Sequence, residues 1–467
     1  MENVLMHFHQ VLNDELGCAS YLLADGGEAI VVDPRWDVDV YVELATKAGA
    51  RIKHVVETHD HADHVSGRGR LARRTGAQMH RPHRDGDPSA QLRAGDVLRA
   101  GRVHLKVIAT PGHRPEHISL LVSDGGRDDN AWCLLAGDSL LVGDVARPDL
   151  AVAAEDGARD LHASIQRILG LGDHVELWPA HVGGSLCGGG CLSPKTSSTI
   201  GFERRVQAAT GLAAEDFVAA IATRTPPKPP NIARIVALNQ SSLHAEPAPP
   251  ALLDAAGLRS ATERGATVLD VRSPAAFDAA HLLGALALGA GQSRPTRVGW
   301  TVDPEESLVI VADDVTEAER FATALHAVGL WGIEGIAADD PAGWRAAGCA
   351  LSTTPAWRVA ELAEAIGGDE IAVIDVRDLD EYDAGHVRGS LHIPLNVLGD
   401  GRGSLPVTPG RRIVVACARG PRAALGASLL RRAGHADVVH VAGGGIPDLA
   451  DRGIALERGD VALELAA

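Results

Sequence analysis

Metal-ligand side chains crowd into one short segment near residue 60. The run His59-Asp60-His61-Ala62-Asp63-His64 holds three imidazoles and two carboxylates within six residues. Side chains at this spacing surround a single ion only when the segment is a loop. Because one histidine at a strand end is usually a hydrogen-bonded surface residue, a metal site requires further ligands elsewhere in the chain.

Further ligand-type residues occur where apolar segments end. The segments KHVVETH, HLKVIATPGH, CLLAGD and VELWPAH read as strands, and they end at His59, His113, Asp138 and His181. Strands that share an edge would bring these four side chains together. The cluster and the strand ends together predict a metal centre.

These segments resemble a known family. THDHADH, TPGHRPEHISL, LLAGDSLLVGDVARPDL and WPAHVGGSLCG are similar to the metallo-β-lactamase fold, specifically its persulfide dioxygenase branch. The resemblance implies an αββα sandwich with one Fe(II) per chain, held by His59, His113 and Asp138. A face of two histidines and one carboxylate leaves positions open for a sulfur ligand, dioxygen and water.

A second metal is the main alternative. In hydrolytic members of the same fold, the residues that match His61, Asp63, His64 and His181 complete a second metal site, and here they form either outer-shell groups or that site. A dinuclear zinc thioester hydrolase of the glyoxalase II type therefore stays open. Arg147 is a candidate for binding a substrate carboxylate or phosphate, with a surface salt bridge as the alternative.

Cysteines near the metal segments have different expected roles. The glycine-rich loop Gly183–Ser193 is expected to fold over the metal as a flap that carries Cys187 and Cys191. In the tandem-domain relatives that the chain resembles, a cysteine of this loop lies near the iron, and Cys187 matches it. We therefore expect the flap cysteines to relay sulfur. Two inert thiols are the alternative. Cys18 and Cys133 lie in apolar runs and are expected in the core.

A second nucleophile follows the segment RIVVA. This strand leads into the loop CARGPR, which places Cys417 at the start of a helix beside Arg419 and Arg422. The helix dipole and the two arginines favour a thiolate there. With DVRDLDEYDAGHVRGSLHIPL, the loop resembles a rhodanese domain, in which a six-residue loop accommodates a persulfide. A buried structural cysteine would be expected inside the strand instead.

The two segments after the first block repeat each other. VLDVRSPAAFDAAHLLGAL matches VIDVRDLDEYDAGHVRGSL, but Asp313 stands in the first copy where Cys417 stands in the second. We interpret the first copy as a pseudo-rhodanese domain that spaces or docks its neighbours. The proline-rich segments TPPKPP and AEPAPP and the break STTP predict the domains 1–240, 251–351 and 355–467, all of the α/β class.

Composition limits the classes of partner. The formal net charge of −17 and the absence of a basic run argue against nucleic acid. The sequence contains no run of about 18 apolar residues, so we expect no membrane helix. Its six cysteines lack the regular spacing of a disulfide framework, which fits a reducing compartment. We therefore expect a cytoplasmic protein, and the sequence leaves its oligomeric state open.

The two resemblances together imply one coupled function in sulfide detoxification. The iron domain would convert a low-molecular-weight thiol persulfide and dioxygen to thiol and sulfite. The Cys417 domain would move sulfane sulfur, forming or using thiosulfate. The sequence does not identify the thiol or the direction of transfer. A non-enzymatic docking role for the repeats is the remaining alternative.

Overall fold

The computed structural model forms two compact units. They are Met1–Lys228 with Ile232–Glu246 and His326–Gly329, and Pro229–Asn231 with Pro247–Leu325 and Leu330–Ala467. The structure describes residues 6–87, 91–125, 128–183, 185, 187–188, 192–223, 227–241, 246–289, 293–399, 405–407 and 410–459. The three predicted domain boundaries stay a prediction, although each predicted repeat has its own sheet in the second unit.

The first unit is a four-layer sandwich. Its two sheets have the orders β1-β2-β3-β4-β5 and β11-β10-β9-β8-β7-β6. The strands are β1 (His7–Asn13), β2 (Cys18–Asp25), β3 (Glu28–Val32), β4 (Arg51–Val56), β5 (Gln78–His80), β6 (Val97–Ala100), β7 (Val103–Ala109), β8 (Ile118–Asp124), β9 (Asp128–Gly137), β10 (Glu176–Pro179) and β11 (Ser198–Thr199). The helices are α1 (Asp39–Lys47), α2 (Arg68–Thr75), α3 (Ala154–Leu169), α4 (Ile200–Val206), α5 (Ala214–Ile221) and α6 (Ile232–Gln240), with a 3₁₀ helix at Ala208–Gly211.

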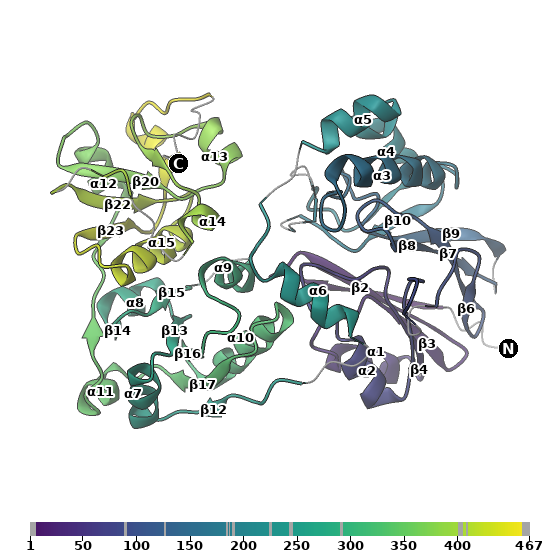
Figure 1. The fold of residues 1–467 in the computed structure, drawn as a ribbon, viewed down its shortest axis with the longest axis horizontal. Helices are drawn as coiled ribbons and strands as arrows, with labels where there is room; N and C mark the ends of the chain where they lie inside the picture. Colours follow the sequence, from purple (N-terminus) through teal and green to yellow (C-terminus); the bar gives the residue numbers. More distant parts are fainter. Residues whose placement is uncertain are drawn as a thin grey trace. The chain divides into compact units, whose positions relative to one another are not determined.

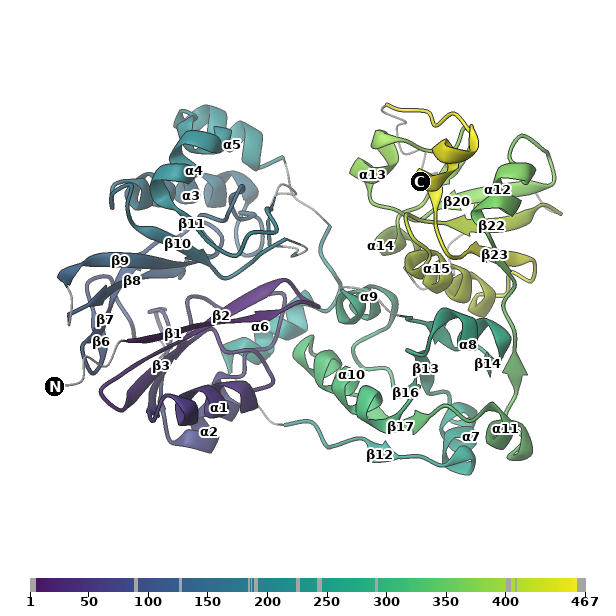
Figure 2. The same cartoon turned by 180° about the vertical axis from the view of Figure 1, so that it is seen from behind.

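Alternating side chains on the strands create the layers. On β2, Tyr21 and Leu23 join the core between the two sheets, whereas Leu22 packs with α1 and α2 on the outer face. The second sheet packs its other face against α3 and α5. Figures 1 and 2 show the helices outside and the sheets inside. The predicted αββα architecture is therefore confirmed.

The second unit holds two parallel sheets of matching order, β12-β17-β16-β13-β15 and β19-β23-β22-β20-β21, and the short pair β14-β18. The strands are β12 (Ala251–Leu252), β13 (Thr267–Asp270), β14 (His281–Leu282), β15 (Leu286–Ala287), β16 (Leu308–Ala312), β17 (Ile333–Ala338), β18 (Leu351–Ser352), β19 (Ala356–Trp357), β20 (Ile371–Asp375), β21 (Leu391–His392), β22 (Arg412–Ala416) and β23 (Val438–Val441). The helices are α7 (Ala255–Glu263), α8 (Pro274–Ala279), α9 (Arg294–Thr301), α10 (Val315–Ala327), α11 (Pro341–Ala346), α12 (Val359–Ala365), α13 (Leu379–Ala384), α14 (Leu395–Leu398) and α15 (Pro421–Arg432), with a 3₁₀ helix at Ile446–Arg452.

The shared motif of the two repeats maintains the fold. Arg377 donates from Nε and Nη2 to Asp375 and from Nη2 to a backbone carbonyl eight residues later. Arg272 makes the same bonds with Asp270 in the first repeat. Both ion pairs are buried, so each carboxylate is satisfied without solvent. The motif therefore stabilises the fold of both repeats, and these residues do not take part in a reaction.

In the described part of the chain, no helix is both long enough and apolar enough to cross a membrane. The cytoplasmic location stays a prediction.

Candidate functional site

The four predicted strand-end residues follow strands, as the sequence indicated. His59 follows β4, His113 follows β7, Asp138 directly follows β9, and His181 follows β10. All four side chains are buried. Although β4 belongs to one sheet and the other three strands to the second, the residues lie at a common edge of the sandwich.

Three buried atoms at this edge converge without hydrogen-bond partners. They are His59 Nε2, His113 Nε2 and Asp138 Oδ2. The carboxylate oxygen lies 3.7 Å from the first nitrogen and 3.3 Å from the second. Buried polar atoms are normally hydrogen-bonded, so three unpaired ones facing each other fit ligands of one cation.

Hydrogen bonds at the other ring nitrogens fix the tautomers. The carbonyl of Arg147 accepts from His113 Nδ1 at 2.9 Å, which leaves the lone pair of that ring on Nε2. The Thr58 hydroxyl donates to Asp33 at 2.8 Å, so it accepts from His59 Nδ1 at 2.9 Å. Burial lowers the pKa of both histidines, which favours the neutral, ligand-competent ring.

The Asp138 carboxylate is also held in place. His181 Nδ1 donates to its Oδ1 at 2.6 Å, and its own backbone N–H donates to His117 Nε2 at 2.8 Å. Burial raises the pKa of Asp138, but His181 and His113 lower it by more, so the net shift is downward. Gly137 has a φ of +55°, and a Cβ there would lie 2.5 Å from the His117 ring. Glycine therefore allows the close approach that positions the carboxylate.

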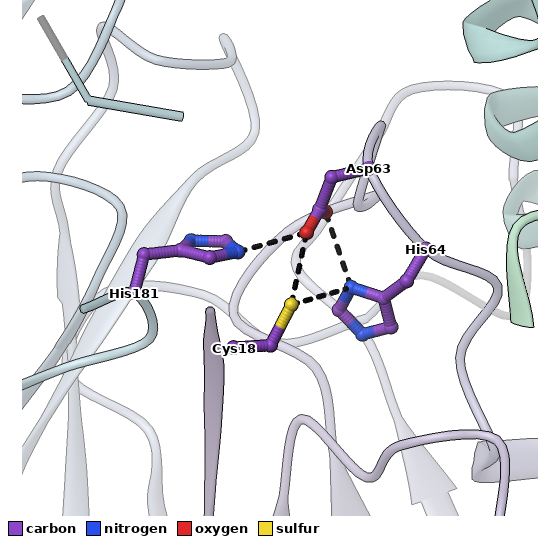
Figure 3. A group of neighbouring side chains, drawn as sticks. All are labelled: Cys18, Asp63, His64 and His181. Atoms are coloured by element: carbon purple, nitrogen blue, oxygen red, sulfur yellow. Dashed lines mark hydrogen bonds and ion pairs between the residues drawn. The ribbon is translucent and has the colours of Figure 1, made fainter. Parts of the chain in front are cut away.

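A second cluster borders the first and joins Cys18, Asp63, His64 and His181 (Figure 3). Asp63 Oδ2 lies 2.8 Å from His181 Nε2 and 3.1 Å from Cys18 Sγ, while Oδ1 lies 3.1 Å from His64 Nδ1. Because His181 faces a carboxylate at each ring nitrogen, it bridges the two clusters as a double donor. Burial lowers the pKa of His181, but Asp138 and its other neighbours raise it by more.

Two residues have neighbours that the sequence did not indicate. Cys18, expected in the core, is buried but faces Asp63; burial and that carboxylate raise the pKa of its thiol. His61, which the sequence grouped with Asp63 and His64, turns its Nε2 to Asp33 and Glu57, at 3.2 and 3.3 Å. Among the described residues, His61 therefore joins a separate carboxylate group and not the His64 cluster.

The flap cysteine lies beside both clusters. Cys187 Sγ falls within 4.8 Å of ligand atoms of Asp138 and His181, and burial raises its pKa to about 12. Burial therefore favours the protonated form of this thiol. The predicted partner in the loop, Cys191, lies outside the described residues. Arg147 is buried and donates from Nε to Asp149 at 2.7 Å, so its role in substrate binding stays a prediction.

The second candidate site lies in the other unit. Cys417 directly follows β22, is 1% exposed, and its Sγ accepts from the Gly420 N–H at 3.1 Å just before α15. Arg422 donates to Glu381 at 2.7 Å and to Asp378 at 3.2 Å, whereas Arg419 is exposed. The loop thus places the Cys417 thiol beside a backbone N–H at a helix N-terminus.

Replacing His181 by alanine tests whether it is a positioning group or a ligand. Asp138 Oδ1 would lose its donor, so we expect the affinity of the three-atom face for a metal ion to fall about 10- to 100-fold while saturation still gives one bound ion there. Iron titration monitored by elemental analysis measures both quantities, with His104→Ala on β7 as the control. Loss of a second bound equivalent would instead identify His181 as a ligand of another metal.

Two segments of this chain match the models of known protein families. The metallo-beta-lactamase superfamily matches residues 13–181, and the rhodanese-like domain matches residues 358–450. Persulfide dioxygenase ETHE1 of Homo sapiens mitochondria is 29% identical over 228 residues, covering 46% of this chain and 79% of that protein. Hydroxyacylglutathione hydrolase of Anaeromyxobacter dehalogenans is 38% identical over 124 residues, covering 26% of this chain and 45% of that protein.

A solved structure extends the similarity beyond the first unit. The crystal structure of a metallo-beta-lactamase from Staphylococcus aureus is 27% identical, with a TM-score of 0.64, and covers 73% of this chain and 100% of that chain. The chain therefore joins a metallo-beta-lactamase domain, with homologues among the ETHE1 persulfide dioxygenases, to a C-terminal rhodanese-like domain.

Proposed function

We propose that this protein is an iron-dependent persulfide dioxygenase with sulfurtransferase activity. The reaction is RSSH + O₂ + H₂O → RSH + SO₃²⁻ + 2 H⁺. The observation that carries the proposal is the set of three unpaired ligand atoms on His59, His113 and Asp138. Fe(II) at such a face supplies the redox chemistry that dioxygen requires.

The surrounding residues prepare this face for one metal. Thr58 and the Arg147 carbonyl hold the two imidazoles with their lone pairs inward, and His181 holds the carboxylate. The neighbouring Asp63 carboxylate is instead occupied by His64, His181 and Cys18. Its hydrogen bonds make it a support for the first site, which favours the mononuclear assignment.

The rival function is a dinuclear zinc thioester hydrolase. The group of Cys18, Asp63, His64 and His181 favours it, because sulfur, nitrogen and oxygen ligands within 4.8 Å suit Zn²⁺. The similarity to a hydroxyacylglutathione hydrolase is consistent with this chemistry. In the hydrolase, His181 would bind zinc through one ring nitrogen, so its hydrogen bond to Asp63 or to Asp138 would have to break. For this reason we place the hydrolase second.

Metal analysis with two substrates separates the functions. The anaerobically purified chain is expected to hold one iron and to consume oxygen with a low-molecular-weight thiol persulfide. Two zinc ions in the active form, with thioester hydrolysis and no oxygen consumption, would overturn the proposal. Comparison of glutathione and coenzyme A persulfides identifies the thiol.

The rhodanese-like domain extends this reaction to thiosulfate. Sulfite attacks the outer sulfur of a Cys417 persulfide, the S–S bond breaks, and thiosulfate leaves with the Cys417 thiolate restored. Cys187, whose thiol lies beside Asp138 and His181, takes the outer sulfur of a second RSSH molecule: a Cys187 S–S bond forms, the S–S bond of RSSH breaks, and RSH leaves. Attack of the Cys417 thiolate on the outer sulfur of the Cys187 persulfide passes that sulfur on and restores the Cys187 thiol. The coupled sequence removes persulfides and serves sulfide detoxification.

A further inference from the structure

The first repeat contacts the second on the side of the Cys417 loop. Helix α9 packs against α14, which packs against α15, the helix that begins at this loop. The Ala287 N–H of β15 donates to Ser428 Oγ of α15 at 3.1 Å, and His440 of β23 meets Asp278 of α8 at 2.9 Å. Figures 1 and 2 both place α9 next to α14. Helix α9 therefore lies beside α14, next to the helix that begins at the Cys417 loop.

The charge of Arg422 is already matched by its own repeat. Glu381 accepts from both guanidinium Nη atoms, and Asp378 accepts from Nη1 as well. These three side chains carry one more negative than positive charge. A thiosulfate dianion that approaches Cys417 therefore gains little from these three side chains, and a further cation at the loop, besides the exposed Arg419, would favour its binding.

Arg297 on α9 is such a cation. It is partly buried, and within the described residues its guanidinium forms no hydrogen bond or ion pair. Burial lowers the pKa of Arg297 and Arg422 lowers it further, whereas Cys417 and Asp378 oppose them, which agrees with the packing of α9 beside α14 and α15. Arg294 on the same helix is instead paired with Glu317 at 3.6 Å and lies over the Phe321 ring.

We propose that Arg297, contributed by the repeat without a nucleophile, binds the oxyanion end of thiosulfate or sulfite at Cys417. A guanidinium matches two oxygens of a planar or tetrahedral anion with parallel N–H donors. The Cys417 thiolate attacks the sulfane sulfur of thiosulfate, the S–S bond breaks, and its electron pair leaves with sulfite. Arg297 holds the sulfonate in the donor and the sulfite in the product.

This assignment gives the first repeat a function that Asp313 cannot supply. Asp313 is exposed after β16, at the position that corresponds to Cys417 after β22. The first repeat has therefore lost the nucleophile and kept a fold that presents α9. The inference rests on the proposed sulfur transfer at Cys417, although anion binding is measurable without it.

Kinetics of the full chain test the role of Arg297. We expect Arg297→Ala to raise the KM for thiosulfate about tenfold with a smaller change in kcat, and Arg297→Lys to restore part of the loss. Arg294→Ala is the matched control, since it removes the same charge from the same helix. An unchanged KM in Arg297→Ala, or an equal loss in Arg294→Ala, would overturn the proposal.

Alkylation of Cys417 separates anion binding from catalysis. Mass spectrometry of the Cys417 peptide gives its rates of reaction with anionic iodoacetate and neutral iodoacetamide. We expect Arg297→Ala to slow iodoacetate about tenfold and to leave iodoacetamide unchanged. Equal slowing of both reagents would mean a structural role and overturn the inference. Charge-selective alkylation in a chain that transfers no sulfur would overturn the proposed function and retain the anion site.

Discussion

Replacing His113 by alanine is expected to abolish iron binding and oxygen uptake together. The variant removes one of three converging ligand atoms and leaves only His59 Nε2 and Asp138 Oδ2. Because loss of a mere supporting group already costs about 10- to 100-fold in metal affinity, loss of this ligand should exceed about a hundredfold. Iron content after anaerobic reconstitution and the rate of oxygen uptake with a thiol persulfide measure the effect.

The matched control is His104→Ala. His104 belongs to β7, the strand that leads to His113, and lies away from the three-atom face. Circular dichroism should show that both variants are folded, since the bond from His113 Nδ1 to the Arg147 carbonyl is one contact in a large core. If His113→Ala retained one iron and its oxygen uptake, the assignment of His113 as an iron ligand would be wrong.

Much of the metal site was predictable because its ligands follow strands. An apolar run that ends in histidine or aspartate identifies both a strand and the edge at which it stops, as for His59, His113 and Asp138. The repeated sequence likewise predicted two sheets of the same order, and the position of Asp313 after β16 agrees with that alignment. Local pattern was sufficient for these features.

The supporting groups were not predictable, because they come from distant segments. Asp33 follows β3 with a φ of +50° and reaches Thr58 through tertiary packing. Cys18 looked like a core residue, and only its backbone bridge to His181 explains why its thiol faces Asp63. Nothing in the HxHxDH motif indicates that His61 turns to other carboxylates. Side-chain direction in a loop depends on the completed fold.

The rhodanese loop shows the same limit. The sequence placed Arg422 beside Cys417 as a cation that favours the thiolate, but Glu381 lies on the neighbouring helix, α13. The structure joins this carboxylate to Arg422. Counting nearby charges in the sequence therefore overestimated the positive potential at Cys417. For this reason, a cation from the first repeat, such as Arg297, would favour the binding of an anion at Cys417.

Replacing Cys417 by serine is expected to eliminate sulfur transfer and to preserve oxygen uptake. A serine hydroxyl stays protonated at neutral pH and is a poor sulfur nucleophile, so transfer from thiosulfate should fall more than about a hundredfold. The proposed iron ligands lie in a different compact unit, so oxygen uptake on a supplied persulfide should stay within about twofold. Sulfite should accumulate in place of thiosulfate.

Chromatographic measurement of sulfite and thiosulfate during oxygen consumption decides this prediction. Cys349→Ser is the control, because Cys349 lies in the first repeat, partly exposed and hydrogen-bonded to the Ala255 carbonyl. If Cys417→Ser lost oxygen uptake on a supplied persulfide, turnover at the iron site would require the second nucleophile. The proposal that the two units catalyse separate reactions would then be wrong.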